Sequence, residues 1–216
     1  MPNFFKKLYS YINPIVIESY SSDVNADLHI LLSKGRYMLC AENAVYSYED
    51  KYINFKRAFE EIDIKKHPFE KVLILGFGLG SIPILMEQIY GRTFDITGVE
   101  LDENIVYLAQ QYGMPKIKSA VKLQIANART YVDVVTEKYD LVISDIFIND
   151  EVPQIFETEE YCNRLQELLT EDGLVLYNRL YHTSKTTATT DLFINDVFSK
   201  KGQVLGSTQI IKPPFL

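Results

Sequence analysis

Residues 72–81 read VLILGFGLGS, and this stretch decides the fold. Its first four residues form a continuous apolar run, which is typical of a strand buried on both faces. Gly76, Gly78 and Gly80 follow directly, and a segment with helical spacing begins at Ser81. Glycine permits a tight turn and a close approach of the backbone to a ligand, while the start of a helix offers free N–H groups. The stretch therefore predicts a strand, a ligand-binding turn and a helix in succession.

The spacing of these glycines distinguishes between cofactors. A dinucleotide-binding turn follows the pattern G-x-G-x-x-G or G-x-G-x-x-A, whose third small residue would fall on Ser81. Here the third glycine is Gly80, so the pattern is G-x-G-x-G. The turn therefore departs from the dinucleotide fingerprint, and a turn that only packs the helix against the strand stays open as an alternative.

Strands and helices alternate along the chain after this turn. The predicted strands are residues 72–75, 94–101, 121–125, 139–145 and 173–177, followed by a helix over 187–198 and a last strand over 203–211. Strands with helical connections imply right-handed crossovers, and therefore an α/β fold with a Rossmann-like, doubly wound, mostly parallel sheet. Such sheets bind ligands at the carboxyl ends of their strands, where the strand order reverses.

The first part of the chain has a different pattern. Its β-rich segments are residues 15–20, 28–32 and 36–40. Gly35 lies between the last two segments, which predicts a hairpin turn there. Apolar residues then recur at helical spacing over residues 52–62. We therefore expect a small region of strands plus a helix over residues 1–66, and a Rossmann-like cofactor-binding domain over residues 67–216.

Charge and composition exclude several classes of partner. The 216 residues include 22 Lys+Arg and 29 Asp+Glu, which gives a formal net charge of −7. This charge would repel nucleic acid and an anionic membrane surface, so we expect neither as a partner. The longest uncharged run, residues 72–86, is too short to span a bilayer, and the N-terminus lacks the apolar segment of a signal peptide. The separate Cys40 and Cys162 and the isolated histidines predict reduced thiols, no metal site and a cytoplasmic protein.

Two carboxylates lie at the end of the second predicted strand. Glu100 ends the strand itself, where a carboxylate can accept hydrogen bonds from both hydroxyls of a ribose. Asp102 lies on the adjoining turn and is a second cofactor-binding candidate, with capping of the next helix as its alternative role.

Two further candidates follow the third and fourth strands. Asn127 leaves the third strand, and its amide offers both donors and an acceptor to an adenine edge, although a turn-forming role is the alternative. Asp145 ends the fourth strand, and packing explains a carboxylate there poorly. It would bind the amino group of a cofactor, or position or deprotonate an amine nucleophile, so it is our candidate catalytic residue.

Substrate-binding candidates come from two other stretches. Tyr46, Tyr48 and Tyr52 cluster just before the predicted helix, where they would wall a substrate pocket or simply fill a strand–helix junction. Asp150 lies in an acidic loop after the fourth strand, which suits a cationic substrate, although a solvated loop is the alternative.

Four stretches carry a resemblance to a known family. They are the glycine turn at 76–80, ELD at 100–102, ANA at 126–128 and YDLVISD at 139–145. In these stretches the chain resembles the S-adenosylmethionine-dependent methyltransferase superfamily and, more narrowly, the spermidine synthase (polyamine aminopropyltransferase) family. The resemblance implies that S-adenosylmethionine, or its decarboxylated form, is the cofactor, that the substrate is a small molecule such as an amine, and that the protein is a homodimer.

The resemblance also assigns roles to residues. The glycines would approach the amino-acid portion of the cofactor, Glu100 would hold the ribose, Asn127 the adenine, and Asp145 would face the reacting region. Leu79 and Ile148 stand where aminopropyltransferases carry aspartates.

Three functions are therefore weighed. The first is a spermidine-synthase-like transferase that moves a methyl group to a small-molecule acceptor. The second is an aminopropyltransferase that uses decarboxylated S-adenosylmethionine and a diamine. The third is a non-catalytic nucleoside-binding module. We expect a transferase, with methyl transfer as the leading hypothesis.

Overall fold

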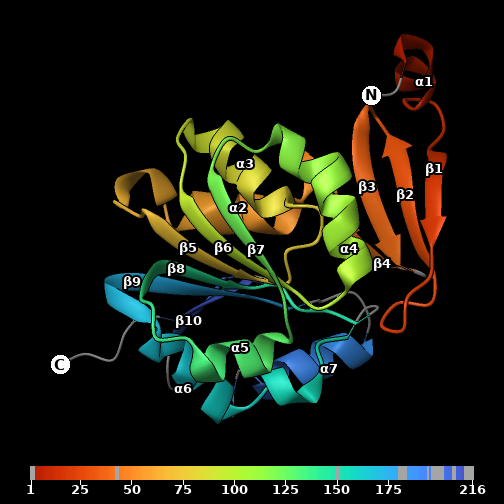
Figure 1. The fold of residues 1–216 in the computed structure, drawn as a ribbon. Coiled ribbons are helices and arrows are strands. Elements are labelled where there is room, and N and C mark those ends of the chain that lie inside the picture. Colours follow the sequence, from red (N-terminus) through yellow and green to blue (C-terminus); the bar gives the residue numbers. More distant parts are fainter. Residues whose placement is uncertain are drawn as a thin grey trace.

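The computed structural model describes residues 3–41, 44–148, 151–179, 184–193, 195, 202–205 and 208–211 (Figure 1). They form one sheet of four strands and one of seven. Helices lie on both faces of the larger sheet (Figure 1). The predicted α/β fold, a doubly wound sheet preceded by a small N-terminal β-region, is confirmed.

The larger sheet positions the site. Its strands are β5 (Lys71–Leu75), β6 (Asp95–Glu100), β7 (Ala120–Ile125), β8 (Tyr139–Ser144), β9 (Leu169–Asn178), β10 (Gly202–Leu205) and β11 (Thr208–Ile211). They are ordered β10-β11-β9-β8-β5-β6-β7, and neighbours among β5 to β9 are parallel. The order reverses between β5 and β8, so a ligand crevice is expected at the carboxyl ends of these two strands.

Strand β5 shows why this sheet needs two layers of helices. Val72 and Ile74 are fully buried in the apolar cluster on one face, while Leu73 and Leu75 are fully buried in the cluster on the other. Side chains alternate between the faces of a strand, so a continuous apolar run requires cover on both.

The covering helices divide between the two faces. The α-helices within the described residues are α1 (Phe4–Tyr9), α2 (Ile53–Glu61), α3 (Ser81–Tyr90), α4 (Glu103–Leu108), α5 (Ala128–Val134), α6 (Glu159–Glu167) and α7 (Ser184–Phe193). Figure 1 shows α2, α3 and α4 on one side of the sheet and α5, α6 and α7 on the other. Thr158 caps α6 by accepting a hydrogen bond from the Tyr161 N–H, which is the satisfaction that a helix start requires.

The smaller sheet is an antiparallel meander. Its strands are β1 (Ile15–Tyr20), β2 (Leu28–Ser33), β3 (Arg36–Ala41) and β4 (Ala44–Ser47). The predicted hairpin turn is confirmed, because Lys34 and Gly35 join β2 to β3 with φ values of 50° and 73°. Two successive positive φ values are typical of the turn that matches the twist of a hairpin. We did not predict α1 or β4.

The smaller sheet docks onto the glycine turn. Leu28, Ile30 and Leu39 of the sheet form one buried cluster with Leu79 of the turn and Leu108 of α4. Figure 1 shows the smaller sheet standing beside α4, at one end of the larger sheet. The side chain at position 79 is therefore part of the apolar interface between the two sheets.

The C-terminal prediction needs correction. We predicted one strand over 203–211, but the chain forms two, β10 and β11, which pair antiparallel with Leu205 opposite Thr208. Gly206 and Ser207 stand between them, and this pair of residue types is typical of a two-residue hairpin loop. Because β-rich residues flank this signal on both sides, the stretch reads as one continuous strand. The helix predicted over 187–198 corresponds to α7, which begins earlier, at Ser184, and is described as far as Phe193; residues 194 and 196–198 lie outside the described residues.

Candidate active site

A cavity of about 580 Å³ lies at the carboxyl ends of β5, β6, β7 and β8, against the smaller sheet. This size suits a nucleoside-sized ligand together with a small partner. The cavity is lined by Val24, Asn25, Ala44, Val45, Tyr46, Tyr48, Lys51, Tyr52, Ile53, Asn54, Gly76, Gly78, Val99, Glu100, Leu101, Ile105, Ala126, Asn127, Ala128, Asp145, Ile146, Phe147, Ile148, Pro153, Ile155 and Phe156. It therefore lies at the reversal of strand order, where the sequence predicted a site.

The glycine turn forms part of the cavity wall. Gly76 has a φ of 84°, and a Cβ atom there would clash with the carbonyl oxygen of Asp145. Gly80 has a φ of 81° and caps α3. Glycine is therefore required at position 76 both by its backbone conformation and by the close approach of β8. The turn holds the ends of the two central strands together.

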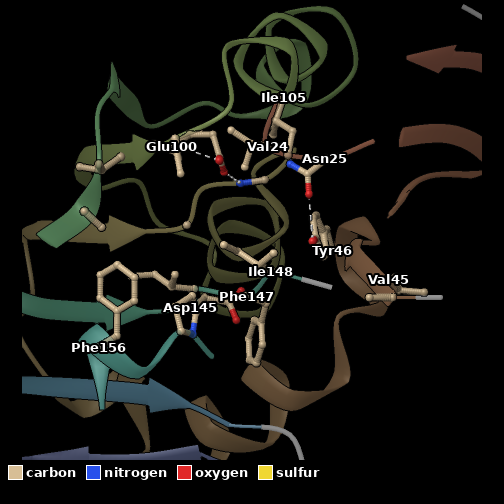
Figure 2. Close-up of a pocket in the computed structure, with 18 of the residues that line it drawn as sticks. Val24, Asn25, Val45, Tyr46, Glu100, Ile105, Asp145, Phe147, Ile148 and Phe156 are labelled. Atoms are coloured by element: carbon tan, nitrogen blue, oxygen red, sulfur yellow. Dashed lines mark hydrogen bonds between the residues drawn. The ribbon is translucent and has the colours of Figure 1, made fainter. Parts of the chain in front are cut away.

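Glu100 lies beside this turn, as predicted. Its carboxylate accepts hydrogen bonds from the N–H groups of Gly78 at 3.1 Å and Leu101 at 2.8 Å, and from that of Asp102 at 3.2 Å. Burial raises the pKa of the Glu100 carboxyl, and the backbone hydrogen bonds oppose this rise. Figure 2 shows this carboxylate at the edge of the cavity, where it accepts the hydrogen bond from the Gly78 N–H. The site thus holds Glu100 in one orientation, facing the volume where a ligand would lie.

Asp102 has a different position from the one that a ligand contact needs. It is buried and is not among the described residues that line the cavity. Its carboxylate accepts from the Asn104 N–H at 2.9 Å, which caps α4. It also accepts from the Ser22 hydroxyl and from the Asn25 amide, so it fixes the loop before β2. The geometry therefore favours the capping role.

Asn127 lines the cavity and caps α5. Its side-chain oxygen accepts a hydrogen bond from the Arg129 N–H at 2.8 Å. This leaves its amide NH₂ to interact with a ligand, so Asn127 could donate to a base but has its acceptor already engaged.

Asp145 lines the cavity, and two side chains hold its carboxyl. The Tyr52 hydroxyl donates to its Oδ1 at 3.2 Å and the Asn178 amide donates to the same oxygen at 2.9 Å. Burial is the main reason why the pKa of the Asp145 carboxyl rises to about 7, while the two hydrogen bonds and the Glu100 charge adjust it. A carboxyl whose pKa lies near neutral pH is suited to accept a proton during a reaction.

The side-chain oxygen of Asn178 is unsatisfied. This Oδ1 atom is buried and has no hydrogen-bond partner among the described residues. Asn178 ends β9, the strand that pairs with β8, and from there its amide donates the hydrogen bond to Asp145. The neighbouring Arg179 pairs with Glu157 and stacks on Phe193.

Tyr46 and Tyr48 both line the cavity, and their hydroxyls are engaged. The Tyr46 hydroxyl donates to the Asn25 side-chain oxygen at 3.0 Å, as the dashed line in Figure 2 shows. The Tyr48 hydroxyl donates to the Ser33 hydroxyl at 2.9 Å. They therefore present mainly their rings to the cavity. Asp150, the third predicted substrate-binding residue, lies outside the described residues.

Several lining residues were not predicted. Asn25 comes from the loop before β2, Lys51 from the short 3₁₀ turn Glu49–Lys51, and Phe147 and Ile148 from the segment after β8. No local motif marks them, because they reach the cavity only through the docking of the smaller sheet and the path of a loop. Separately, no helix within the described parts of the chain is long and apolar enough to cross a membrane.

Comparisons with known proteins agree with this architecture. The model of the spermine/spermidine synthase domain family matches residues 56–201. A polyamine aminopropyltransferase of Vibrio vulnificus (strain CMCP6) is 28% identical over 120 residues, which are 54% of this chain and 39% of that protein. A polyamine aminopropyltransferase of Korarchaeum cryptofilum (strain OPF8) is 29% identical over 162 residues, which are 71% of this chain and 49% of that protein. The chain spans less than half the length of these relatives.

Solved structures share the fold. A crystal structure of spermidine synthase from Thermotoga maritima superimposes with a TM-score of 0.67 at 18% identity, covering 90% of this chain and 70% of that one. Human methyltransferase-like protein 13 in complex with SAH gives a TM-score of 0.51 at 18% identity, covering 69% and 74%. At these identities the structures show the common fold alone. The family model, however, matches more than half of the sequence, and the chain therefore belongs to the spermine/spermidine synthase domain family.

Proposed function

We propose that this protein transfers an aminopropyl group from decarboxylated S-adenosylmethionine to an amine. The observation that carries the proposal is the position of Asp145, a carboxyl with a pKa of about 7, in the same cavity as the glycine turn and Glu100. The aminopropyltransferases among its relatives support this reaction over methyl transfer, which was our leading expectation.

The residues present suit the nucleoside part of such a donor. The Glu100 carboxylate is fixed by backbone N–H groups and faces the cavity, where it would accept hydrogen bonds from ribose hydroxyls. Asn127 would donate from its amide to an adenine ring nitrogen. The glycine turn has no side chains in the way of the ligand. The donor supplies an already activated carbon next to its sulfonium.

The acceptor reacts as a neutral amine. Its nitrogen attacks the methylene carbon next to the sulfonium, so a C–N bond forms and the C–S bond breaks with its electron pair going to sulfur. The products are the aminopropylated amine, 5′-methylthioadenosine and one proton. Asp145 would take up that proton, and holding both reactants in one cavity would supply much of the rate enhancement.

The test is a product assay that separates the three hypotheses. The protein is incubated with decarboxylated or intact S-adenosylmethionine and a panel of primary amines, and the nucleoside products are identified by mass spectrometry. Amine-dependent 5′-methylthioadenosine from the decarboxylated donor is expected. S-adenosylhomocysteine from the intact donor would instead establish methyl transfer. Tight nucleoside binding without any product would establish a non-catalytic module.

The role of Asp145 is tested with the variant Asp145→Asn. This change keeps the size of the side chain and its ability to accept from Tyr52, but removes the proton acceptor. We expect a loss of kcat of about 10²- to 10⁴-fold, which is the usual contribution of a general base. Unchanged kcat in this variant would show that Asp145 has another role.

A further inference from the structure

Few charged side chains face the cavity. Among the described residues that line it, Glu100 and Asp145 are acidic and Lys51 is basic. Glu100 is held beside the glycine turn by three backbone N–H groups, on the side assigned to the nucleoside. In this part of the structure Asp145 is therefore the acid available to an acceptor amine.

The surface beyond Asp145 is apolar. Figure 2 shows Val45, Phe147 and Ile148 on one side of Asp145, with Phe156 on the opposite side. The rings of Tyr46 and Tyr48 extend this surface, because their hydroxyls already bind Asn25 and Ser33. Such a wall favours a hydrocarbon chain or ring, and an ammonium group placed on it without a partner would lose its hydration at a cost.

The two acids of the short turn Glu49–Lys51 are already paired. Glu49 accepts from the Lys116 ammonium and from the Tyr37 N–H. Asp50 pairs with the Arg36 guanidinium at 2.6 Å. The third residue of the same turn is Lys51, which lines the cavity and forms no ion pair with any described residue. The charge that this turn presents to the cavity is therefore positive, and it would repel a second ammonium on an acceptor.

We propose that the preferred acceptor is a primary monoamine with an apolar tail, rather than a diamine. This inference rests on the proposed aminopropyl transfer and specifies its acceptor. The reacting nitrogen would lie at Asp145, and the tail would lie along the apolar wall toward Lys51. The tail takes no part in the bond changes, so it affects the binding and positioning of the acceptor.

Two amines of equal length test the proposal. Hexylamine and 1,5-diaminopentane have the same number of heavy atoms and differ only in a terminal methyl or ammonium group. With decarboxylated S-adenosylmethionine as donor and 5′-methylthioadenosine as readout, we expect kcat/KM for hexylamine to be at least tenfold higher. An equal or higher value for the diamine would overturn the inference and leave the aminopropyl transfer intact. Absence of product with every amine would overturn the transfer itself, and this inference with it.

Two charge-reversal variants refine the test. Lys51→Glu replaces the base that lines the cavity with an acid, so the ratio of kcat/KM for the diamine to that for hexylamine should rise about tenfold. Lys122→Glu makes the same charge change on the exposed edge strand β7, outside the cavity, and should leave the ratio unchanged. An unchanged ratio in Lys51→Glu, with binding of the donor intact, would contradict the role given to Lys51.

Discussion

Tyr52 and Asp145 stand 93 positions apart in the sequence, yet the hydroxyl of the first donates a hydrogen bond to the carboxylate of the second at 3.2 Å. The contact joins the residue just before α2 to the end of β8. It stabilises the ionised carboxylate, whereas burial destabilises it. The pKa of Asp145 is therefore set in part by a residue that belongs to the N-terminal region.

Tyr52→Phe should shift the pH profile of the reaction. Losing a hydrogen bond to the ionised form raises the pKa of Asp145 above its value of about 7, so less of the carboxylate is ionised at neutral pH. We expect the acidic limb of the kcat profile to move to higher pH and kcat at pH 7 to fall about tenfold. Tyr107→Phe, on the exposed face of α4, is the control. A uniform loss of rate without a shift of the limb would indicate a purely structural role for Tyr52.

Asp145→Asn should stabilise the fold at alkaline pH. The carboxyl has a pKa of about 7 in the folded chain against a reference value of 3.8, so the folded state resists its ionisation. The contribution of this carboxyl to the free energy of unfolding is complete below pH 4 and is lost as the pH rises through 7. The variant removes that loss, and we expect a gain of about 4 kcal/mol at pH 8 and none at pH 4, because the rise of the pKa from 3.8 to about 7 is roughly three tenfold steps in proton affinity, each worth about 1.4 kcal/mol.

Thermal unfolding at both pH values measures this effect. The same substitution at the exposed Asp172, on the early part of β9, should change the unfolding temperature little at either pH. A destabilised Asp145→Asn protein at pH 8 would contradict the assigned direction of the pKa.

Gly76 and Gly91 provide a matched pair of glycine substitutions. Both have positive φ, 84° and 65°, so alanine is strained at both positions by about 1 kcal/mol. At Gly91 an added Cβ meets no atom within 4 Å, whereas at Gly76 it meets the backbone of Asp145. We expect Gly76→Ala to lower the unfolding free energy by a further 2 kcal/mol or more, at about the scale of overpacking. Nucleoside binding by the Gly91→Ala protein should be normal, and equal stabilities of the two variants would contradict the close approach.

Glu100→Gln tests the predicted contact with ribose. The amide keeps one acceptor but loses the charge, so hydrogen bonds from the ribose hydroxyls weaken. We expect affinity for 5′-methylthioadenosine to fall about tenfold by titration calorimetry. Affinity for the 2′-deoxy analogue should fall much less, because one of the two hydroxyls is already missing. An equal loss for both ligands would indicate that Glu100 acts only by shaping the turn.

The parts of the fold and site that could be predicted from sequence are those with local signals. The apolar run before Gly76, the carboxylates at the ends of β6 and β8, and Asn127 at the end of β7 each follow from the residues next to them. The doubly wound topology then brings these strand ends together, since parallel strands share one edge of the sheet.

The rest depends on contacts between distant segments. Asn25 and Lys51 reach the cavity only because the smaller sheet docks against α4 and the glycine turn, and no periodicity encodes that docking. The C-terminal hairpin was missed because Gly206 and Ser207 interrupt a β-rich stretch only briefly. The role of Asp102 could not be decided from the sequence, because a helix cap and a ligand contact require the same residue type at the same position.

Ser47, at the end of β4 in the smaller sheet, and Ser81, at the start of α3, share a hydrogen bond between their hydroxyls at 2.6 Å, and this bond ties the smaller sheet to the Rossmann-like part of the chain. One wall of the cavity belongs to each sheet, so the cavity exists only while they are docked. Contacts between distant segments are slow to form, so a newly synthesised chain would acquire nucleoside binding only after both sheets have docked. Because the docked surfaces share a buried apolar cluster, heating should abolish this binding and unfold the chain together.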